Sequence, residues 1–186
     1  DEVKKVKNAS FLDSAFDNYY NRLVVSIAGS KEPVLQAALN ASLKALQLID
    51  MRKHKGQHPR LGAVDVVPFI PIKNVTLEDC VALAREFGKT LAEKGGVPIY
   101  LYGLAALKLE RKDLDWIREG EYEKLAEMII KPDRKPDFGP AMFIPKSGAT
   151  ITGARKVMAG FNVNLGTPDL KIAKKIARAL HSQKGG

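Results

Sequence analysis

The chain has 186 residues, of which 45% are hydrophobic and 27% are charged. This length suits one domain with a substantial core, and the balance of residue types excludes wholesale disorder. No apolar run approaches the ~20 residues of a membrane helix, no signal-peptide pattern is present, and the single cysteine, Cys80, excludes an internal disulfide. We therefore expect a soluble protein of the cytoplasm, with no membrane partner.

The net charge of +9 and the isoelectric point near 9.6 indicate an anionic partner. Nucleic acid, a membrane surface and a polyanionic small molecule all satisfy this requirement. The basic residues are scattered, however, and the aromatic residues, 7% of the chain, do not alternate with them. Platforms for single-stranded nucleic acid combine the two residue types, so the pattern disfavours nucleic acid.

The first part of the chain predicts a helix end, two strands and a helix. Residues 1–7 are typical of the last turns of a helix. Strands are predicted over 10–15 and 22–29, joined by a polar turn. Ser30 can cap the next helix, with Pro33 in its first turn. Its apolar positions recur at helical spacing: Leu35, Leu39, Ser42, Leu46 and Ile49.

The stretch HKGQHPRLGAVDVVPFIPI, residues 54–72, contains two of the three histidines. Gly56 and Pro59 predict a loop through these histidines, because glycine loosens the backbone and proline lacks a donor. The apolar residues that follow predict a strand. Pro68 and Pro71 confine this strand to a sheet edge or end it early.

Helices and strands alternate in the next part of the chain. Thr76 and Asp79 have the spacing of a capping box and open a helix with an apolar stripe. A short strand is predicted over 97–102. One or two short helices follow within 114–130, broken near Gly120.

Four prolines mark a long loop over 131–148, and this length hints at a binding function. Residues 156–164 alternate between an apolar face and a face with amides, including Asn162 and Asn164, which predicts a strand. Thr167 and Pro168 open a final helix. Its predicted inward residues are Leu170, Ala173, Ile176, Ala177 and Leu180.

This order of elements predicts an α+β fold, with a mixed β-sheet and helices packed on one face in a ferredoxin-like sandwich. Metal binding has little support: His54 and His58 stand four apart, but Gly56 and Pro59 prevent the helix that would bring them together. No phosphate loop is present. His58 remains open to two interpretations, a structural histidine and a proton carrier.

Several motifs together resemble the glutamate formimidoyltransferase (formiminotransferase) family. These are RKHKGQHPRLGAVDVVPFIPI, VPIYLYG, REGEYE, PDFGP and GATITGARKVMAGFNVNLGTPD, and the resemblance runs from about Phe11 to the last helix. It implies one domain over 1–186, equivalent to the N-terminal subdomain of the family. The first strand and the C-terminal subdomain of the family would then be absent from this sequence.

The resemblance implies a transferase of histidine degradation that moves a formimino group between N5 of tetrahydrofolate and the amino group of L-glutamate. Tetrahydrofolate is then a co-substrate and no metal is needed. His58, in the HPR motif, corresponds to the family's catalytic histidine and would act as general acid and base. The folate-contacting loop corresponds to Gly139, Pro140, Ala141, Met142, Phe143, Ile144, Pro145, Lys146, Ser147 and Gly148. Within it, Lys146 is placed to hold a carboxylate of folate.

Other functions stay open at this point. The chain is alternatively a non-catalytic folate-binding module, or a transferase of formyl rather than formimino groups, since both activities would use the same loop and histidine. Nucleic-acid binding driven by the +9 charge is a third possibility. The oligomeric state is equally open, with a homodimer or a missing C-terminal subdomain as the partner.

Overall fold

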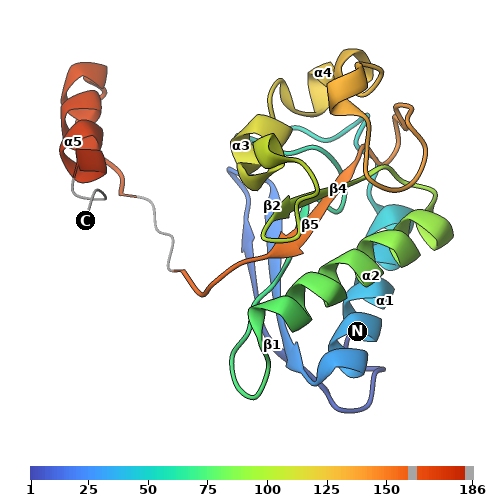
Figure 1. Cartoon of the computed structure of the whole chain (residues 1–186). Helices are drawn as coiled ribbons and strands as arrows, with labels where there is room; N and C mark the ends of the chain where they lie inside the picture. Colours follow the sequence, from blue (N-terminus) through green and yellow to red (C-terminus); the bar gives the residue numbers. More distant parts are fainter. Residues whose placement is uncertain (159–162, 183–186) are drawn as a thin grey trace.

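The computed structural model describes residues 1–158 and 163–182, with side chains described as far as residue 180 (Figure 1). The strands are β1 (Ala9–Asp17), β2 (Arg22–Gly29), β3 (Val66–Phe69), β4 (Ile99–Gly103) and β5 (Thr150–Ala154). The helices are α1 (Lys31–Leu48), α2 (Leu77–Gly95), α3 (Leu114–Ile117), α4 (Glu121–Met128) and α5 (Leu170–Ser182), with short 3-10 turns η1 (Leu109–Lys112) and η2 (Pro132–Arg134).

Two sheets contain these strands. β1 and β2 form an antiparallel hairpin, and β3, β5 and β4 form a parallel sheet in that order. The predicted α+β class, with both parallel and antiparallel pairing, is confirmed. Pro68 pairs in register with Gly153 of β5, which is the one neighbour of β3 in the described part of the chain, so the prediction of an edge strand is also confirmed.

Side chains of the parallel sheet alternate between two apolar clusters. Ile99 and Phe69 belong to the first, which α2 covers and α1 backs. Tyr100 and Ile151 belong to the second, together with residues from the short helices α3 and α4. Because neighbouring residues of a strand point to opposite faces, the sheet is covered on both sides. The layers are visible in Figure 1, with α2 on one side of the sheet and α3 and α4 on the other.

Local signals placed most helix ends correctly. The capping box is present, with Thr76 accepting from the Asp79 backbone N–H and Asp79 accepting from that of Thr76. Gly120, at φ 79°, separates α3 from α4 as predicted. Cys80 is buried against the first cluster, and none of the helices in the described residues has the length and apolar character needed to cross a membrane.

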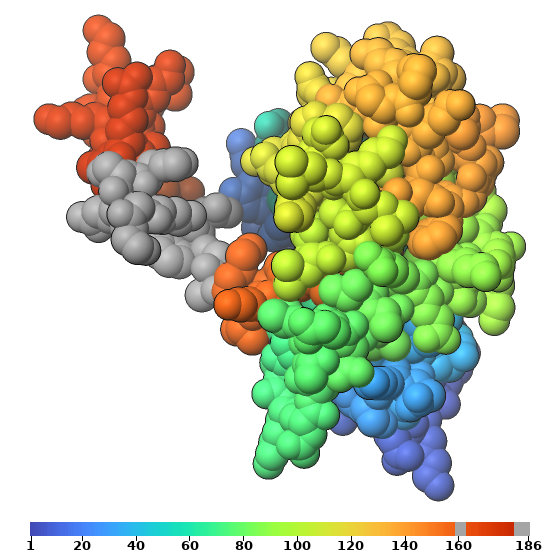
Figure 2. Space-filling view, viewed as in Figure 1, coloured from blue at the N-terminus to red at the C-terminus, as the bar shows by residue number. Residues whose placement is uncertain are grey.

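Three local predictions were wrong. Residues 1–7 form turns rather than a helix. The strand in the last third is β5, and the predicted strand 156–164 is not formed at 156–158 or 163–164, while 159–162 lie outside the described residues. The last helix forms, but its apolar residues are not inward, since Leu170 is 71% and Leu180 is 64% exposed. Figure 2 shows α5 standing to one side of the other elements, which explains this exposure.

Candidate functional site

His58 lies where the β1–β2 hairpin, its own loop and α3 meet. The Tyr20 ring is edge-on to the His58 ring, with centroids 6.0 Å apart and planes at 78°. Arg118, the residue after α3, forms an ion pair with Asp65, whose other oxygen accepts a 2.9 Å hydrogen bond from the Leu61 N–H. The imidazole is partly buried. It is therefore held among polar groups and an aromatic ring rather than inside either apolar cluster.

The surroundings keep this imidazole neutral. Burial lowers the pKa of His58 below its usual 6.5, and the positive charges of Arg22 and Arg118 lower it further. A backbone hydrogen bond at Pro59 and the Asp65 carboxylate act in the opposite direction, with smaller effect. A neutral imidazole at pH 7 can accept a proton, which is the state that a general base requires.

Residues 139–148, the second half of the proline-rich loop, run directly beside the segment that follows His58. Ala63 N–H donates to the Ser147 carbonyl at 2.8 Å, and Ala149 N–H donates to the Leu61 carbonyl at 3.2 Å. Gly62 and Gly148 form the isolated antiparallel bridge between these two segments. The structure thus brings the end of loop 139–148 against the histidine loop, through backbone contacts that leave no room for side chains.

Gly148→Ala is expected to destabilise the protein by about 2–4 kcal/mol. Gly148 has φ +67°, and a Cβ there would lie 2.1 Å from the Leu61 carbonyl oxygen. Gly96→Ala is the matched control, since Gly96 has φ +64° but no atom within 4 Å of the added Cβ, and should cost only about 1 kcal/mol. Urea unfolding of both variants measures the difference. Equal losses would contradict a tight junction between the loops.

A buried ion pair lies just before residue 139, where the same loop begins. Arg111 is fully buried and lies 2.6 Å from the Asp137 carboxylate, which is 5% exposed. Asp137 also accepts from the Leu101 N–H at 2.7 Å, while Arg111 donates to the Lys135 carbonyl. The start of the loop is therefore tied to β4 through Asp137 and Leu101, and its end is tied to the histidine loop through the bridge to Gly62.

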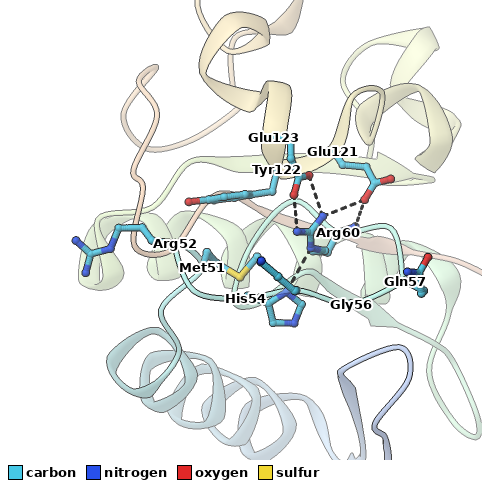
Figure 3. Close-up of a pocket in the computed structure, with 10 residues that line it drawn as sticks. Met51, Arg52, His54, Gly56, Gln57, Arg60, Glu121, Tyr122 and Glu123 are labelled. Carbon is cyan, nitrogen blue, oxygen red and sulfur yellow. Dashed lines mark hydrogen bonds and ion pairs between the residues drawn. The ribbon is translucent and has the colours of Figure 1, made fainter.

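An open hollow of about 560 Å³ lies beside the two loops (Figure 3). Arg60, at its centre, donates to Glu123 at 2.6 Å and to Glu121 at 3.2 Å. Tyr122 donates to the Pro145 carbonyl at 2.5 Å and lies 5.4 Å from the Phe143 ring, so the proline-rich loop borders the hollow. The lining residues are Met51, Arg52, His54, Lys55, Gly56, Gln57, Arg60, Glu121, Tyr122 and Glu123.

His54 has a structural role in this arrangement. Its Nδ1 accepts from Arg60 Nε at 3.3 Å, so its Nε2 carries the hydrogen and donates to the Asn21 carbonyl at 2.9 Å. Both ring nitrogens are therefore engaged with the protein. His58, in contrast, has a hydrogen bond to the backbone at Pro59.

Sequence reasoning singled out the histidine and the loop but did not predict which residues lie next to them. Lys146 is turned toward α1, where its ammonium donates to the Gln47 carbonyl at 3.1 Å, and it does not line the hollow. Arg22 and Arg118 approach His58 from elements distant in sequence. Glu121 and Glu123 pair with Arg60, which joins the REGEYE motif to the HPR motif. No local sequence pattern predicts these contacts between charged residues.

Comparison with known families defines the class of this protein. A model of the formiminotransferase domain, N-terminal subdomain, matches residues 1–155. The chain therefore belongs to the formiminotransferase domain family. Within that family the matched part is the N-terminal subdomain, and the resemblance inferred from the motifs is confirmed.

Curated relatives agree with this assignment. The chain is 50% identical over 166 residues to formimidoyltransferase-cyclodeaminase of Rattus norvegicus, covering 89% of the chain and 30% of that protein. It is 42% identical over 188 residues to glutamate formimidoyltransferase of Thermoplasma acidophilum, covering 100% of the chain and 62% of that protein. For glutamate formimidoyltransferase of Streptococcus pyogenes the identity is 37% over 184 residues, covering 99% and 62%. The chain thus spans from under a third to about three fifths of these proteins.

Proposed function

We propose that this chain is the N-terminal part of a folate-dependent transferase that moves a formimino group between N5 of tetrahydrofolate and the amino group of L-glutamate. His58 is the general acid and base, and residues 139–148 contact the folate. The observation that carries the proposal is the backbone bridge between Gly62 and Gly148, because it holds the loop beside the histidine segment. Relatives named glutamate formimidoyltransferase support the substrates.

The reaction requires one proton to move from N5 of tetrahydrofolate to the nitrogen of glutamate. N5 of tetrahydrofolate attacks the formimino carbon of formiminoglutamate, and neutral His58 removes the proton from N5 as the new N–C bond forms. The imidazolium then gives that proton to the glutamate nitrogen as the old C–N bond breaks. An imidazole suits both steps, because its pKa lies close enough to neutrality for it to accept and return a proton.

The proposal is tested with the intact protein by two measurements. Calorimetric titration with tetrahydrofolate measures binding. A transfer assay compares the formimino and formyl derivatives of glutamate as donors to tetrahydrofolate, by measuring the glutamate released. We expect binding and preferential formimino transfer. Folate binding without turnover would identify a binding module instead, and turnover with the formyl donor alone would reassign the transferred group.

The acid limb of the pH profile of kcat/KM is expected below pH 6.5. His58 must be neutral to accept the proton, and burial with the two arginines lowers its pKa in the folded protein. Activity therefore stays level from neutral pH down to that lowered value and falls as His58 becomes protonated. A limb centred above 6.5, measured in the intact protein, would show that another group is the base.

For location we propose the cytoplasm. Cys80 is a free, buried thiol, and burial raises its pKa, so it is unreactive and suits a reducing compartment.

A further inference from the structure

Two guanidinium groups influence His58, and they differ in how they are paired. Arg118 is paired with Asp65. Arg22, in contrast, makes no ion pair within the described residues, and its Nε is buried without a hydrogen-bond partner there. The Arg22 guanidinium lies 5.6 Å from the centre of the Tyr20 ring, which is also the ring against His58. An uncompensated cation is therefore held beside the proposed base.

The nearby carboxylates are already committed to other donors. Asp17 is the register partner of Arg22 across the hairpin, but it accepts from the Tyr20 N–H at 2.8 Å. Asp65 accepts from Arg118 and from the Leu61 N–H. A buried donor without an acceptor is costly, and a guanidinium is well shaped for a carboxylate. Within the described residues, the buried Nε of Arg22 therefore has no acceptor, and its guanidinium has no counter-charge.

We propose that Arg22 binds the α-carboxylate of the glutamate substrate and positions its nitrogen at His58. This inference rests on the proposed function, because it takes the substrate from there. The α-carboxylate is favoured over the γ-carboxylate because it is attached to the carbon that bears the reacting nitrogen. An anchor beside the base must hold the part of the substrate closest to the reaction. Arg22 is a positioning residue, and the Tyr20 ring fixes its orientation.

The kinetic test uses Arg22→Gln and Arg22→Lys in the intact protein. Arg22→Gln should raise KM for formiminoglutamate roughly 10- to 100-fold, as loss of a charged hydrogen bond implies, with little change in KM for tetrahydrofolate. Arg22→Lys should recover part of the loss, since it keeps the charge but not the fork of donors. The control is Arg85→Gln, which removes an exposed positive charge from α2 and should change neither KM.

Substrate analogues identify the carboxylate. The α-amide of formiminoglutamate lacks the α-carboxylate and should be a poor substrate of the unmodified protein. Arg22→Gln should raise KM for this amide little further. The γ-amide keeps the α-carboxylate, so Arg22→Gln should raise KM for the γ-amide by as large a factor as it raises KM for formiminoglutamate. The reverse pattern would assign Arg22 to the γ-carboxylate and overturn the proposal. Equal increases in both KM values would show a purely structural role and would overturn it as well.

Titration of His58 by NMR separates this inference from the proposed function. N-Acetyl-L-glutamate, whose nitrogen is uncharged, should raise the pKa of His58 in the unmodified protein, because its carboxylate offsets the charge of Arg22. Arg22→Gln should raise that pKa without ligand and remove the response to N-acetyl-L-glutamate. This readout needs no turnover, so it tests Arg22 even if His58 proves unnecessary for transfer. An unchanged response in Arg22→Gln would overturn the proposal.

Discussion

Replacing His58 with alanine is expected to lower kcat for formimino transfer by about 10²- to 10⁴-fold, the usual contribution of one general acid–base group. Binding of tetrahydrofolate should persist, because loop 139–148 is fixed by Gly62, β4 and Tyr122 and not by the imidazole. Steady-state kinetics and calorimetric titration with tetrahydrofolate check the two parts separately. Both proton-transfer steps lose their carrier and the equilibrium constant of the reaction is unchanged, so the reverse reaction should slow as well.

Added imidazole provides the control for this variant. A small base that diffuses into the space left by His58→Ala should restore part of the rate, and the restored rate should rise with the concentration of neutral imidazole. A purely structural histidine would give no such rescue. Transfer within about threefold of the unmodified rate, or folate binding lost together with folding, would refute the role assigned to His58.

Asp137→Asn is expected to destabilise the protein by about 3–5 kcal/mol, the usual cost of breaking a buried ion pair. The substitution leaves the fully buried Arg111 without its counter-charge and weakens the acceptor for the Leu101 N–H. Urea unfolding measures the loss. Affinity for tetrahydrofolate should also fall, because Asp137 immediately precedes Phe138, whose carbonyl accepts from Ile99 at the start of the proline-rich loop.

A double variant separates the pair from its surroundings. Arg111→Met combined with Asp137→Leu removes both charges, and its cost should be smaller than that of Asp137→Asn alone, since no unpaired charge stays buried. A loss below 1 kcal/mol for Asp137→Asn would mean that water or another group compensates Arg111. A double variant less stable than the single one would show that the pair itself is a net source of stability.

The sequence predicted those parts of the fold that depend on short-range chemistry. Thr76 and Asp79 satisfy each other across one helical turn, Gly120 supplies a left-handed backbone, and Pro68 lacks the donor needed in a central strand. Residues 156–158 show the limit of such patterns. Their alternation is compatible with a strand, but pairing requires a free edge at the right place, and that edge is a property of the whole sheet.

The candidate site divides in the same way. His58 and loop 139–148 were placed by family resemblance, and the glycines explain how the two segments approach. The partners of His58 could not be predicted, because Arg22 reaches it from the hairpin and Arg118 from the end of α3. Charge pairing between distant elements depends on packing, and a single sequence has no local signal for it.

The strand order of the parallel sheet also constrains how this protein is made. Both neighbours of β5 precede it in the sequence, so β3 and β4 are synthesised before the central strand that pairs with both of them. Until Ala154 has left the ribosome, each has an open backbone edge, which is the kind of surface that chaperones shield and that aggregates recruit. The Gly62–Gly148 bridge also cannot form before this part of the chain is synthesised, because Gly148 lies directly before β5. Ribosome-bound chains that stop before Thr150 should therefore be readily cleaved by protease, and those that expose Ala154 should be resistant.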